Sequence, residues 1–339
     1  MNVTAYNSAQ AFDALKPEWN DLVSRSNADC IFSTWEWQSV WWRSYQPGSL
    51  WVFACRDGSG RLVGLAPWFI HDQSDGTRVV SPVGGREVTD YLDIIVDREQ
   101  SEAVVECLVN YIAAQADCFD RIELCNLPEN SAGYRLLPAA FERHGFVATI
   151  EHEDVCPIIE LPQTWDEYLA SLDKKQRHEI RRKLRRAQGA NESLEWHIVE
   201  SGRAIEAKIN VFLGLMAASS PEKSRFLADQ KNEAFFRAMI PVVQQAGWLQ
   251  LAFLTVGGEA VAAYLNFDYG NRILVYNSGL MQEEYGHLSP GIVLLSHLIQ
   301  HAIQTHHVVF DFLQGDEPYK YRMGARDTHV YNLIVRRDR

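Results

Sequence analysis

The sequence predicts a mixed α/β fold built from two tandem domains, each a twisted mixed sheet flanked by helices. Two observations lead to this prediction. The chain has 339 residues, which is long for a single hydrophobic core. The order hairpin, strand, helix, strand also occurs twice along it, as a duplicated α/β unit would show. We therefore expect an N-terminal domain over 1–160 and a C-terminal domain over 161–339.

The first copy of this order lies in the N-terminal half. Residues 51–56 and 60–69 are rich in β-branched and aromatic side chains and are separated by a glycine turn, which predicts a hairpin. Residues 90–96 predict a further strand, and a helix is expected at about 99–116. Residues 121–126 predict the last strand of the copy.

The second copy repeats the order. A hairpin is expected from 249–254 and 258–267, then a strand at 273–278, a helix at about 290–305 and a strand at 308–313. The two hairpins also match at a constant offset, at Gly60, Val63 and Phe69 and at Gly258, Val261 and Phe267. Both the elements and the residues thus support duplication.

Composition limits the possible classes of protein. Hydrophobic residues make up 47% of the chain, and no apolar run approaches the roughly 20 residues of a bilayer-spanning helix, so we expect a globular protein without membrane insertion. The net charge of −12 argues against DNA binding, because nucleic-acid phosphates are held by basic surfaces. The six cysteines form no Cys-x-x-Cys pair and the start lacks a signal-peptide pattern, so we expect a reduced, cytoplasmic protein.

One segment is strongly basic although the chain as a whole is acidic. Residues 174–186 carry eight of the 32 Lys and Arg residues. Ile180, Leu184 and Ala187 recur at helical spacing, so a basic helix with one buried stripe is expected at about 173–188. Two interpretations stay open. The helix is either a solvated face that pairs with the surplus acids, or a positive wall for a phosphate or an acidic glycan.

Two helix starts are indicated by capping signals. Thr164 with Glu167 predicts a capping box. Ser289 suits an N-cap and Pro290 the first helical position. Because the first N–H groups of a helix have no intrahelical acceptor, this second start could bind a phosphate beside Gly291, or it could bind nothing.

The segment after the last predicted strand is rich in reactive side chains. Residues 308–313 contain one acid, Asp311, and Gly315 then breaks the strand. Asp316 and the cluster 319–322, Tyr-Lys-Tyr-Arg, follow at once. In open α/β sheets ligands bind where strands end. The alternative is a strand, a turn and a solvated loop whose tyrosines cap the core.

Two further groups of residues are interpreted as structural. His297 and His301 lie four apart on a predicted helix, but no glutamate of a His-Glu-x-x-His motif accompanies them, so no metal is expected. The tryptophans at 35, 37, 41 and 42 could stack on sugar rings. Aromatic residues at helical spacing more often pack a core, and we favour that interpretation.

Four segments of the chain carry a family resemblance. They are 32–37 with Trp41 and Trp42, 173–181, Tyr285 with 289–291, and 310–320. Together they resemble the Gcn5-related N-acetyltransferase (GNAT) superfamily. More narrowly, they resemble the CelD-like acetyltransferases associated with bacterial cellulose and exopolysaccharide synthesis, which are relatives of the FemAB peptidyltransferases. The resemblance extends over almost the whole chain.

The resemblance implies an acyltransferase that moves an acyl group, most simply acetyl, from acyl-coenzyme A to an amine or hydroxyl. The acceptor would be a small molecule, a glycan or a cell-envelope precursor. The C-terminal domain would bind the coenzyme, and the N-terminal domain, whose helix entry at 96–100 is acidic, would be structural or bind the acceptor. The alternatives are a FemAB-like aminoacyl-tRNA-dependent ligase, the one case in which transfer RNA would be a partner, and a non-catalytic scaffold with the same fold.

The candidate site residues fall into three groups. The expected catalytic residues are Asp316 and Tyr319, either of which would be the base, and Lys320, which would neutralise developing charge or a phosphate. The expected cofactor-binding residues are Tyr285, Ser289, Pro290, Gly291 and Ile292. The expected substrate-binding residues are Asp90, Asp93, Arg177, Arg181 and Tyr276.

Overall fold

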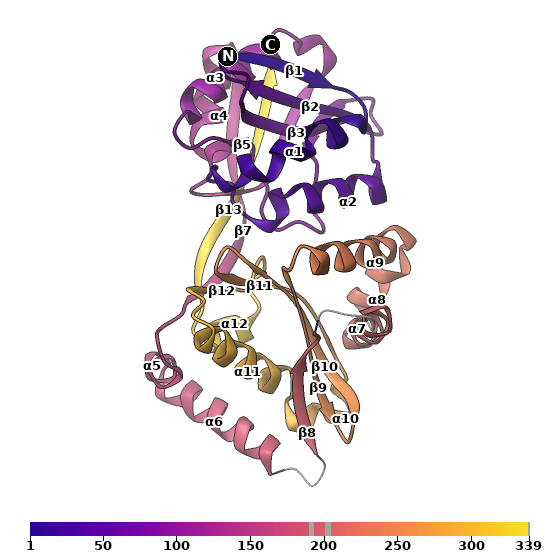
Figure 1. Cartoon of the computed structure of the whole chain (residues 1–339), viewed down its shortest axis with the longest axis vertical. Coiled ribbons are helices and arrows are strands. Elements are labelled where there is room, and N and C mark those ends of the chain that lie inside the picture. Colours follow the sequence, from indigo (N-terminus) through magenta and orange to yellow (C-terminus); the bar gives the residue numbers. More distant parts are fainter. Residues whose placement is uncertain (190–192, 201–204, 338–339) are drawn as a thin grey trace. The chain divides into compact units, whose positions relative to one another are not determined.

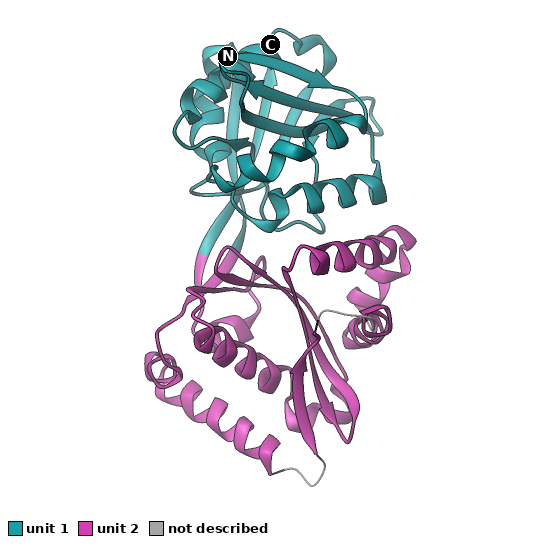
Figure 2. Cartoon of the chain, viewed as in Figure 1, with its two compact units in different colours: residues 1–155, 328–339 teal, residues 156–327 magenta. Residues whose placement is uncertain are grey.

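A computed structural model describes residues 1–189, 193–200 and 205–337 (Figure 1). The chain forms two compact units (Figure 2): unit 1 contains Met1–Val155 and Thr328–Arg339, and unit 2 contains Cys156–Asp327. Each unit is a mixed sheet flanked by helices, so the predicted fold class is confirmed. The C-terminal residues belong to unit 1 rather than to the second domain, because strand β13 (Arg326–Arg337) pairs with β6 (Arg121–Pro128).

Unit 1 is built on a sheet in which most neighbouring strands are antiparallel. Its order is β1 (Asn2–Tyr6), β2 (Ser49–Arg56), β3 (Leu62–Asp72), β4 (Arg78–Pro82), β6, β13 and β7 (Phe146–Glu160), and the short β5 (Ile95–Val96) pairs with β3. Strands β4 and β6 are parallel. The flanking helices are α1 (Gln10–Ser24), α2 (Trp35–Tyr45), α3 (Ser101–Ala113) and α4 (Ala132–Arg143), with short 3₁₀ turns η1 (Ile31–Ser33) and η2 (Ala116–Cys118).

Unit 2 repeats this arrangement. Its strand order is β8 (Leu194–Ile198), β9 (Leu249–Val256), β10 (Glu259–Tyr269), β11 (Arg272–Leu280), β12 (Val309–Asp311) and the end of β7. One face carries α11 (Pro290–Gln304), and the other carries α7 (Ile205–Ser219), α8 (Pro221–Ala228) and α9 (Gln230–Gln245) (Figure 1). The remaining elements are α5 (Trp165–Ser171), α6 (Lys174–Gln188), α10 (Gln282–Tyr285), η3 (Gly286–Leu288) and α12 (Pro318–Arg322).

The predicted duplication is confirmed in the order of elements. Hairpin β2–β3 precedes β4, α3 and β6 in unit 1, and hairpin β9–β10 precedes β11, α11 and β12 in unit 2. In both units the last strand of the repeat runs parallel to the strand that follows the hairpin, β12 to β11 and β6 to β4.

One predicted strand is wrong. The segment 90–96 was expected to be the third strand of the first copy, but that position is taken by β4, and only Ile95–Val96 pair in this segment. Leu92 and Ile94 are as buried as strand residues, yet the Leu92 N–H donates to the carbonyl of Asn126 outside any ladder. The apolar residues of this segment indicated correctly that it is buried, but a buried loop has the same pattern as a buried strand.

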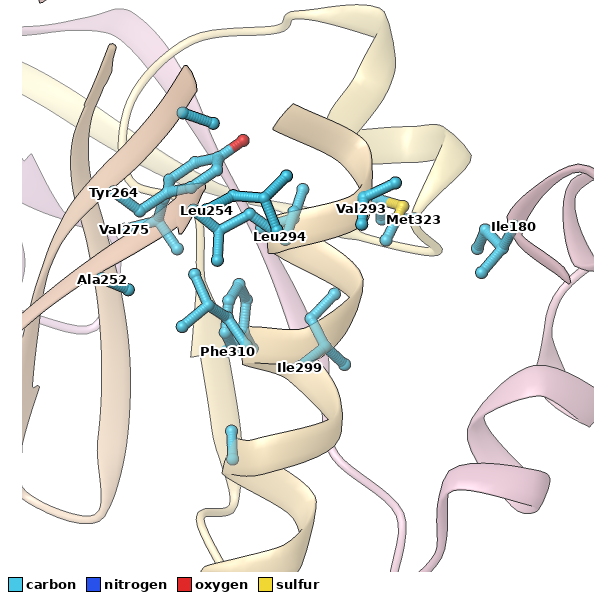
Figure 3. Packing of buried hydrophobic residues seen from close by; sticks show 14 of the residues in the cluster. Ile180, Ala252, Leu254, Tyr264, Val275, Val293, Leu294, Ile299, Phe310 and Met323 are labelled. Atoms are coloured by element: carbon cyan, nitrogen blue, oxygen red, sulfur yellow. The ribbon is translucent and has the colours of Figure 1, made fainter. Parts of the chain in front are cut away.

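The core of unit 2 explains the positions of its helices. Leu294, Ile299 and Phe310 pack with Leu254 and Val275 of the sheet (Figure 3). In unit 1, the tryptophans at 35, 37, 41 and 42 are at most 9% exposed, which confirms their interpretation as core residues. The side chain of Ile180 joins the unit 2 cluster from α6, as the predicted apolar stripe required.

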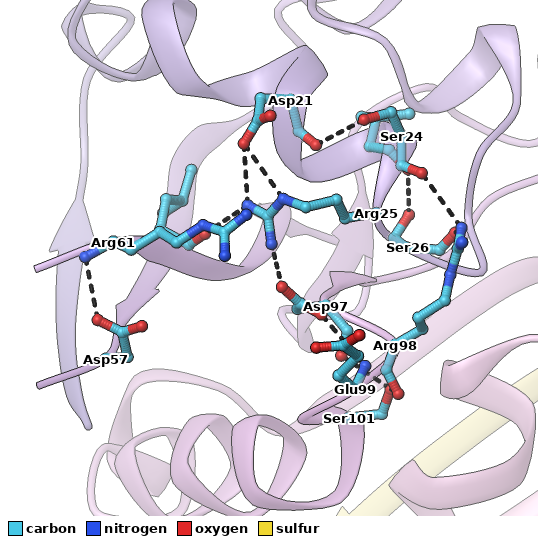
Figure 4. Close-up of polar contacts among 12 residues, drawn as sticks. Asp21, Ser24, Arg25, Ser26, Asp57, Arg61, Asp97, Arg98, Glu99 and Ser101 are labelled. Atoms are coloured by element: carbon cyan, nitrogen blue, oxygen red, sulfur yellow. Dashed lines mark hydrogen bonds and ion pairs between the residues drawn. The ribbon is translucent and has the colours of Figure 1, made fainter. Parts of the chain in front are cut away.

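Polar contacts fix the start of α3 in unit 1 (Figure 4). The Arg25 guanidinium, at the end of α1, donates to the buried carboxylate of Asp97, to Asp21 and to the Leu62 carbonyl. Arg98 donates to the carbonyl of Ser26 at 2.7 Å. A buried carboxylate is tolerated here because a guanidinium pairs with it.

The predicted capping box of α5 is present, with both the Thr164 and Glu167 side chains hydrogen-bonded to backbone N–H groups. In the described ranges, no helix has the length and apolar character needed to cross a membrane.

Candidate active site

The most distinctive feature of unit 2 is a pair of parallel strands, β11 and β12, whose backbone pairing ends after three residues. Strands β11 and β12 pair over three residues, Arg272 with Val309, Ile273 with Phe310 and Leu274 with Asp311. Strand β11 then continues to Leu280, whereas the chain after β12 turns away through positive φ values of 56° at Leu313 and 106° at Gly315. The edge of β11 beyond Leu274 therefore has no partner in β12.

The open part of β11 is irregular. The register with β10 shifts between Leu265, opposite Asn277, and Asn266, opposite Val275, so Tyr276 is the extra residue of a β-bulge. The Tyr276 ring packs against Phe267 and Phe236, with centroids 5.0 Å and 5.8 Å away. Bulges of this kind re-aim neighbouring groups and occur frequently beside active sites.

Two side chains form hydrogen bonds with Ser278 at the edge of β11. The Ser278 N–H donates to Asn277 Oδ1 at 2.9 Å. The Nζ of Lys223, on α8, donates to the Ser278 carbonyl at 2.6 Å and lies 3.3 Å from its Oγ. Burial lowers the pKa of Lys223 to about 8, although nearby Glu317 acts in the opposite direction. Sequence reasoning missed both Lys223 and Glu317, since Lys223 lies about 55 residues before its partner and no local pattern connects them.

The loop after β12 is held by Lys320. This side chain is 2% exposed, and its Nζ donates to the carbonyls of Leu313, Gln314 and Gly315 at 3.2, 2.6 and 2.9 Å. It also pairs with Glu317 at 2.9 Å. The amine was expected to face a ligand. Its donors are instead directed into the loop, so in this structure Lys320 fixes the backbone that carries the other candidates.

Asp316 and Tyr319 differ in environment. Asp316 is exposed on the loop. Tyr319 is half-buried and packs against Phe312, with ring centroids 6.0 Å apart. Burial raises the pKa of the Tyr319 phenol, and the nearby Tyr264 and Glu317 raise it further. The phenol therefore stays protonated at neutral pH, which suits a proton or hydrogen-bond donor rather than the base that was one expectation for it.

The start of α11 has the expected position but a different reason for its glycine. Ser289 is the N-cap residue, in a left-handed conformation with φ 54° and no side-chain cap, and Pro290 is in the first turn. A Cβ on Gly291 would lie 3.0 Å from Leu280 Cδ2. The glycine thus lets α11 approach β11, where sequence analysis expected it to let a ligand approach. The N–H groups of Gly291 and Ile292 are at the helix start, where intrahelical acceptors are lacking.

The basic helix α6 ends beside this helix start. Arg186 Nη1 donates to the carbonyl of His287 in η3 at 3.1 Å. Arg177 is half-buried and Arg181 is exposed. Unit 2 therefore contains both the expected cofactor-binding residues and these two expected substrate-binding arginines. Tyr285 lies nearby in sequence and its hydroxyl donates to Glu259 at 3.1 Å.

Asp90 and Asp93 belong to unit 1. Asp93 accepts from the N–H groups of Ile94, Ala132 and Gly133 at 2.8, 3.0 and 2.7 Å, so it caps the start of α4. Burial raises the pKa of Asp93 to about 7, against the effect of these three donors. Asp93 was expected to bind substrate, and the structure gives its carboxylate a structural partner instead.

The corresponding strand pair of unit 1 does not leave an open edge. Strands β4 and β6 also pair briefly, at Val79 with Arg121 and Val80 with Ile122. Beyond this pair the chain itself bonds to β6, through Leu92 N–H to the Asn126 carbonyl and Asn126 Nδ2 to the Thr89 carbonyl. This difference favours unit 2 as the unit that binds a ligand between its strands.

The histidine pair on α11 packs with an aromatic residue. Trp196 stacks on His297 at 5.2 Å and meets His301 at 6.1 Å between ring centroids. In the part of the chain that the structure describes, no group of three or more His, Cys, Asp or Glu residues is placed to hold a metal ion.

Comparison with known families agrees with this geometry. Residues 174–321, somewhat less than half of the chain, match the family model of the acetyltransferase (GNAT) domain. The match runs from α6 into α12 and includes the open strand pair. This segment of unit 2 is thus similar in sequence to the GNAT acetyltransferase domain. A search of curated protein sequences finds no match.

Solved structures share the fold along nearly the whole chain. FemX superposes with a TM-score of 0.64 at 11% identity, covering 98% of this chain and 97% of FemX. A conserved protein of unknown function from Bacteroides thetaiotaomicron gives a TM-score of 0.61 at 13% identity, covering 99% and 100%. The L-PGS structure from Bacillus licheniformis gives 0.55 at 11%, covering 98% and 93%. At such identities the likeness shows the fold alone.

Proposed function

We propose that unit 2 transfers an acyl group, most simply acetyl, from acyl-coenzyme A to an amine or hydroxyl acceptor. The observation that carries this proposal is the opening of the β11–β12 pair after three residues, inside the segment that matches the GNAT acetyltransferase domain. An open strand edge offers backbone hydrogen bonds to an extended ligand, and the arm of coenzyme A is an extended chain with amide groups.

The residues present fit such a co-substrate. The Gly291 and Ile292 N–H groups at the start of α11 would hold phosphate oxygens, which the helix dipole favours. The Arg186 guanidinium beside η3 adds positive charge at this end. The backbone of Val275 to Leu280 would line the arm, although the N–H and the carbonyl of Ser278 within it already bond to Asn277 and Lys223. Coenzyme A supplies the acyl group as a thioester, which is already activated for transfer.

The loop after β12 supplies the polar groups of the reaction centre. Lys320 fixes the loop backbone, so that Tyr319 is held in one place. The protonated Tyr319 hydroxyl would donate to the leaving sulfur or to negative charge that develops during transfer. Asp316, exposed on the same loop, would contact the acceptor.

The acceptor is proposed from the motifs and from charge. The CelD-like resemblance points to a glycan or cell-envelope precursor in polysaccharide biosynthesis, handled in the cytoplasm. Helix α6 presents eight Lys and Arg residues in a chain with a net charge of −12, and only Glu179 opposes them within the helix. Such a surface would attract an anionic acceptor at low ionic strength.

Thermal unfolding with added ligand tests the proposal. Acetyl-coenzyme A at a concentration 100 times its Kd should stabilise the protein by about 2.7 kcal/mol. A non-hydrolysable aminoacyl-tRNA analogue should not. Stabilisation by the tRNA analogue alone would favour the FemAB-like ligase, and no response to either ligand would favour a scaffold.

A variant at the helix start locates the binding site. Ser289 makes no side-chain cap, so Ser289→Asp removes no capping hydrogen bond and should keep the fold stable, while its carboxylate repels the phosphates. We expect the Kd for acetyl-coenzyme A to rise at least tenfold by calorimetry. Ser289→Asn has nearly the same shape without the charge and should bind like the wild type. Equal affinity in both variants would exclude this helix start as the phosphate site.

A further inference from the structure

Lys223 is a partly buried amine that the proposed function does not yet use. It extends from α8 to the open edge of β11, where its Nζ lies 2.6 Å from the Ser278 carbonyl oxygen and 3.3 Å from Ser278 Oγ. Ser278 is two residues past the bulge at Tyr276 and four past the last residue paired with β12. The amine therefore lies on the part of the β11 edge that is not paired with β12.

The partners of Lys223 distinguish it from Lys320. Both amines interact with Glu317. Lys320 forms the direct ion pair and three further hydrogen bonds to carbonyls, so its donors are all directed to groups of its own loop. In the described ranges, Lys223 has no carboxylate within ion-pair distance, and its hydrogen-bond partners are the uncharged oxygens of Ser278.

Three elements surround the Lys223 amine: its own helix α8, Ser278 of β11, and the loop after β12, which contributes the negative charge of Glu317. Lys320 on that loop compensates the same carboxylate. Burial without a direct counter-ion disfavours the ammonium form, in line with the lowered pKa of Lys223. A substantial fraction of the amine is then neutral near pH 8, which is the condition for a lysine to accept a proton.

We propose that Lys223 is the general base of the acyl transfer. This role rests on the proposed function. The acceptor nitrogen or oxygen forms the new bond to the thioester carbonyl carbon, and the carbon–sulfur bond breaks. The acceptor proton passes to the neutral Lys223 amine, and the departing thiolate takes a proton from the Tyr319 hydroxyl or from water. The products are the acylated acceptor and coenzyme A. Lys223 afterwards returns its proton to solvent, and a Tyr319 that has donated its proton takes one up from solvent.

Competitive labelling with trace acetic anhydride tests this placement without an acceptor. The reactivity of each lysine is measured by mass spectrometry between pH 6 and pH 11, with and without coenzyme A. We expect Lys223 to titrate near pH 8, below its ordinary value of 10.5, and to be protected when coenzyme A binds. Titration of Lys223 at its ordinary value, or bound coenzyme A without protection of Lys223, would overturn the proposal.

Turnover of acetyl-coenzyme A with glucosamine as amine probe supplies the second measurement. Lys223→Arg keeps the charge and the donors but cannot act as a base, so both Lys223→Arg and Lys223→Met should lose about 10²–10⁴-fold in kcat. A role in holding Ser278 alone would spare the arginine variant. Lys16→Arg, a matched change in unit 1, should behave like the wild type.

The two proposals fail in different ways. If wild-type protein does not bind coenzyme A, the proposed function fails and the role of Lys223 fails with it. If coenzyme A binds and Lys223→Arg remains fully active, only the role of Lys223 is refuted. If glucosamine is not a substrate, the labelling result decides alone.

Discussion

Replacing Lys320 by methionine is the sharpest test of how the loop after β12 is built. Methionine has a similar volume and suits a buried site, so the change removes the amine with little effect on packing. Three loop carbonyls, at Leu313, Gln314 and Gly315, lose their donor, and Glu317 loses its ion pair. At about 1 kcal/mol for each lost carbonyl bond, unit 2 should lose about 3 kcal/mol of unfolding free energy.

Hydrogen exchange followed by mass spectrometry measures this effect locally, which matters because a protein with two units need not unfold in one step. Amides of the segment 311–325 should exchange faster in Lys320→Met, while peptides of unit 1 stay unchanged. Arg322→Met is the matched control, since Arg322 is exposed on the same helix and should change stability by less than about 0.5 kcal/mol. Equal exchange in the two variants would refute the view that Lys320 holds the loop.

Three further changes test other parts of the fold. Thr164→Ala removes the capping box of α5 and should cost about 1 kcal/mol in urea unfolding, whereas Thr164→Ser should be nearly neutral; equal losses would contradict this. Asp93→Ala should destabilise unit 1 by about 1–2 kcal/mol, because three N–H groups lose their acceptor, and should leave coenzyme A binding unchanged by calorimetry; a specific loss of acceptor binding would restore its expected role. The pKa of Lys223 is lowered from 10.5 to about 8 in the folded protein, so the unfolded chain binds more protons between these pH values. Wild-type stability, measured against Lys223→Met, should therefore rise as pH rises from about 8 to 10.5, and a flat difference would show that the amine is not desolvated.

Much of the fold could be predicted because local patterns reflect local physics. The hairpins, the helix before the last strand of each repeat and the basic helix follow from side-chain periodicity, which records which face of an element is buried. The capping box was found because its two hydrogen bonds join residues three apart. The prediction of a strand at 90–96 was wrong because burial alone does not distinguish a strand from a buried loop.

The candidate site was predictable only in part. The motif after β12 and the start of α11 were located because each is a continuous segment. The roles of single residues were harder to assign. Gly291 suggested an open approach, yet its hydrogen faces Leu280. Lys320 suggested a ligand contact, yet its amine points into its own loop. A side chain's direction depends on neighbours that the local sequence does not contain.

The sequence by itself determined the α/β class, most of the repeated order of hairpin, strand, helix and strand, and the segments that carry the reactive groups, because these depend on contacts between residues close together in the chain. The tertiary structure alone decided that β11 and β12 part after three residues, that unit 1 fills its own gap, and that Lys223 reaches Ser278 across 55 positions. The physical reason is that strand pairing and the desolvation of a charge are set by whichever distant groups the folded chain brings together.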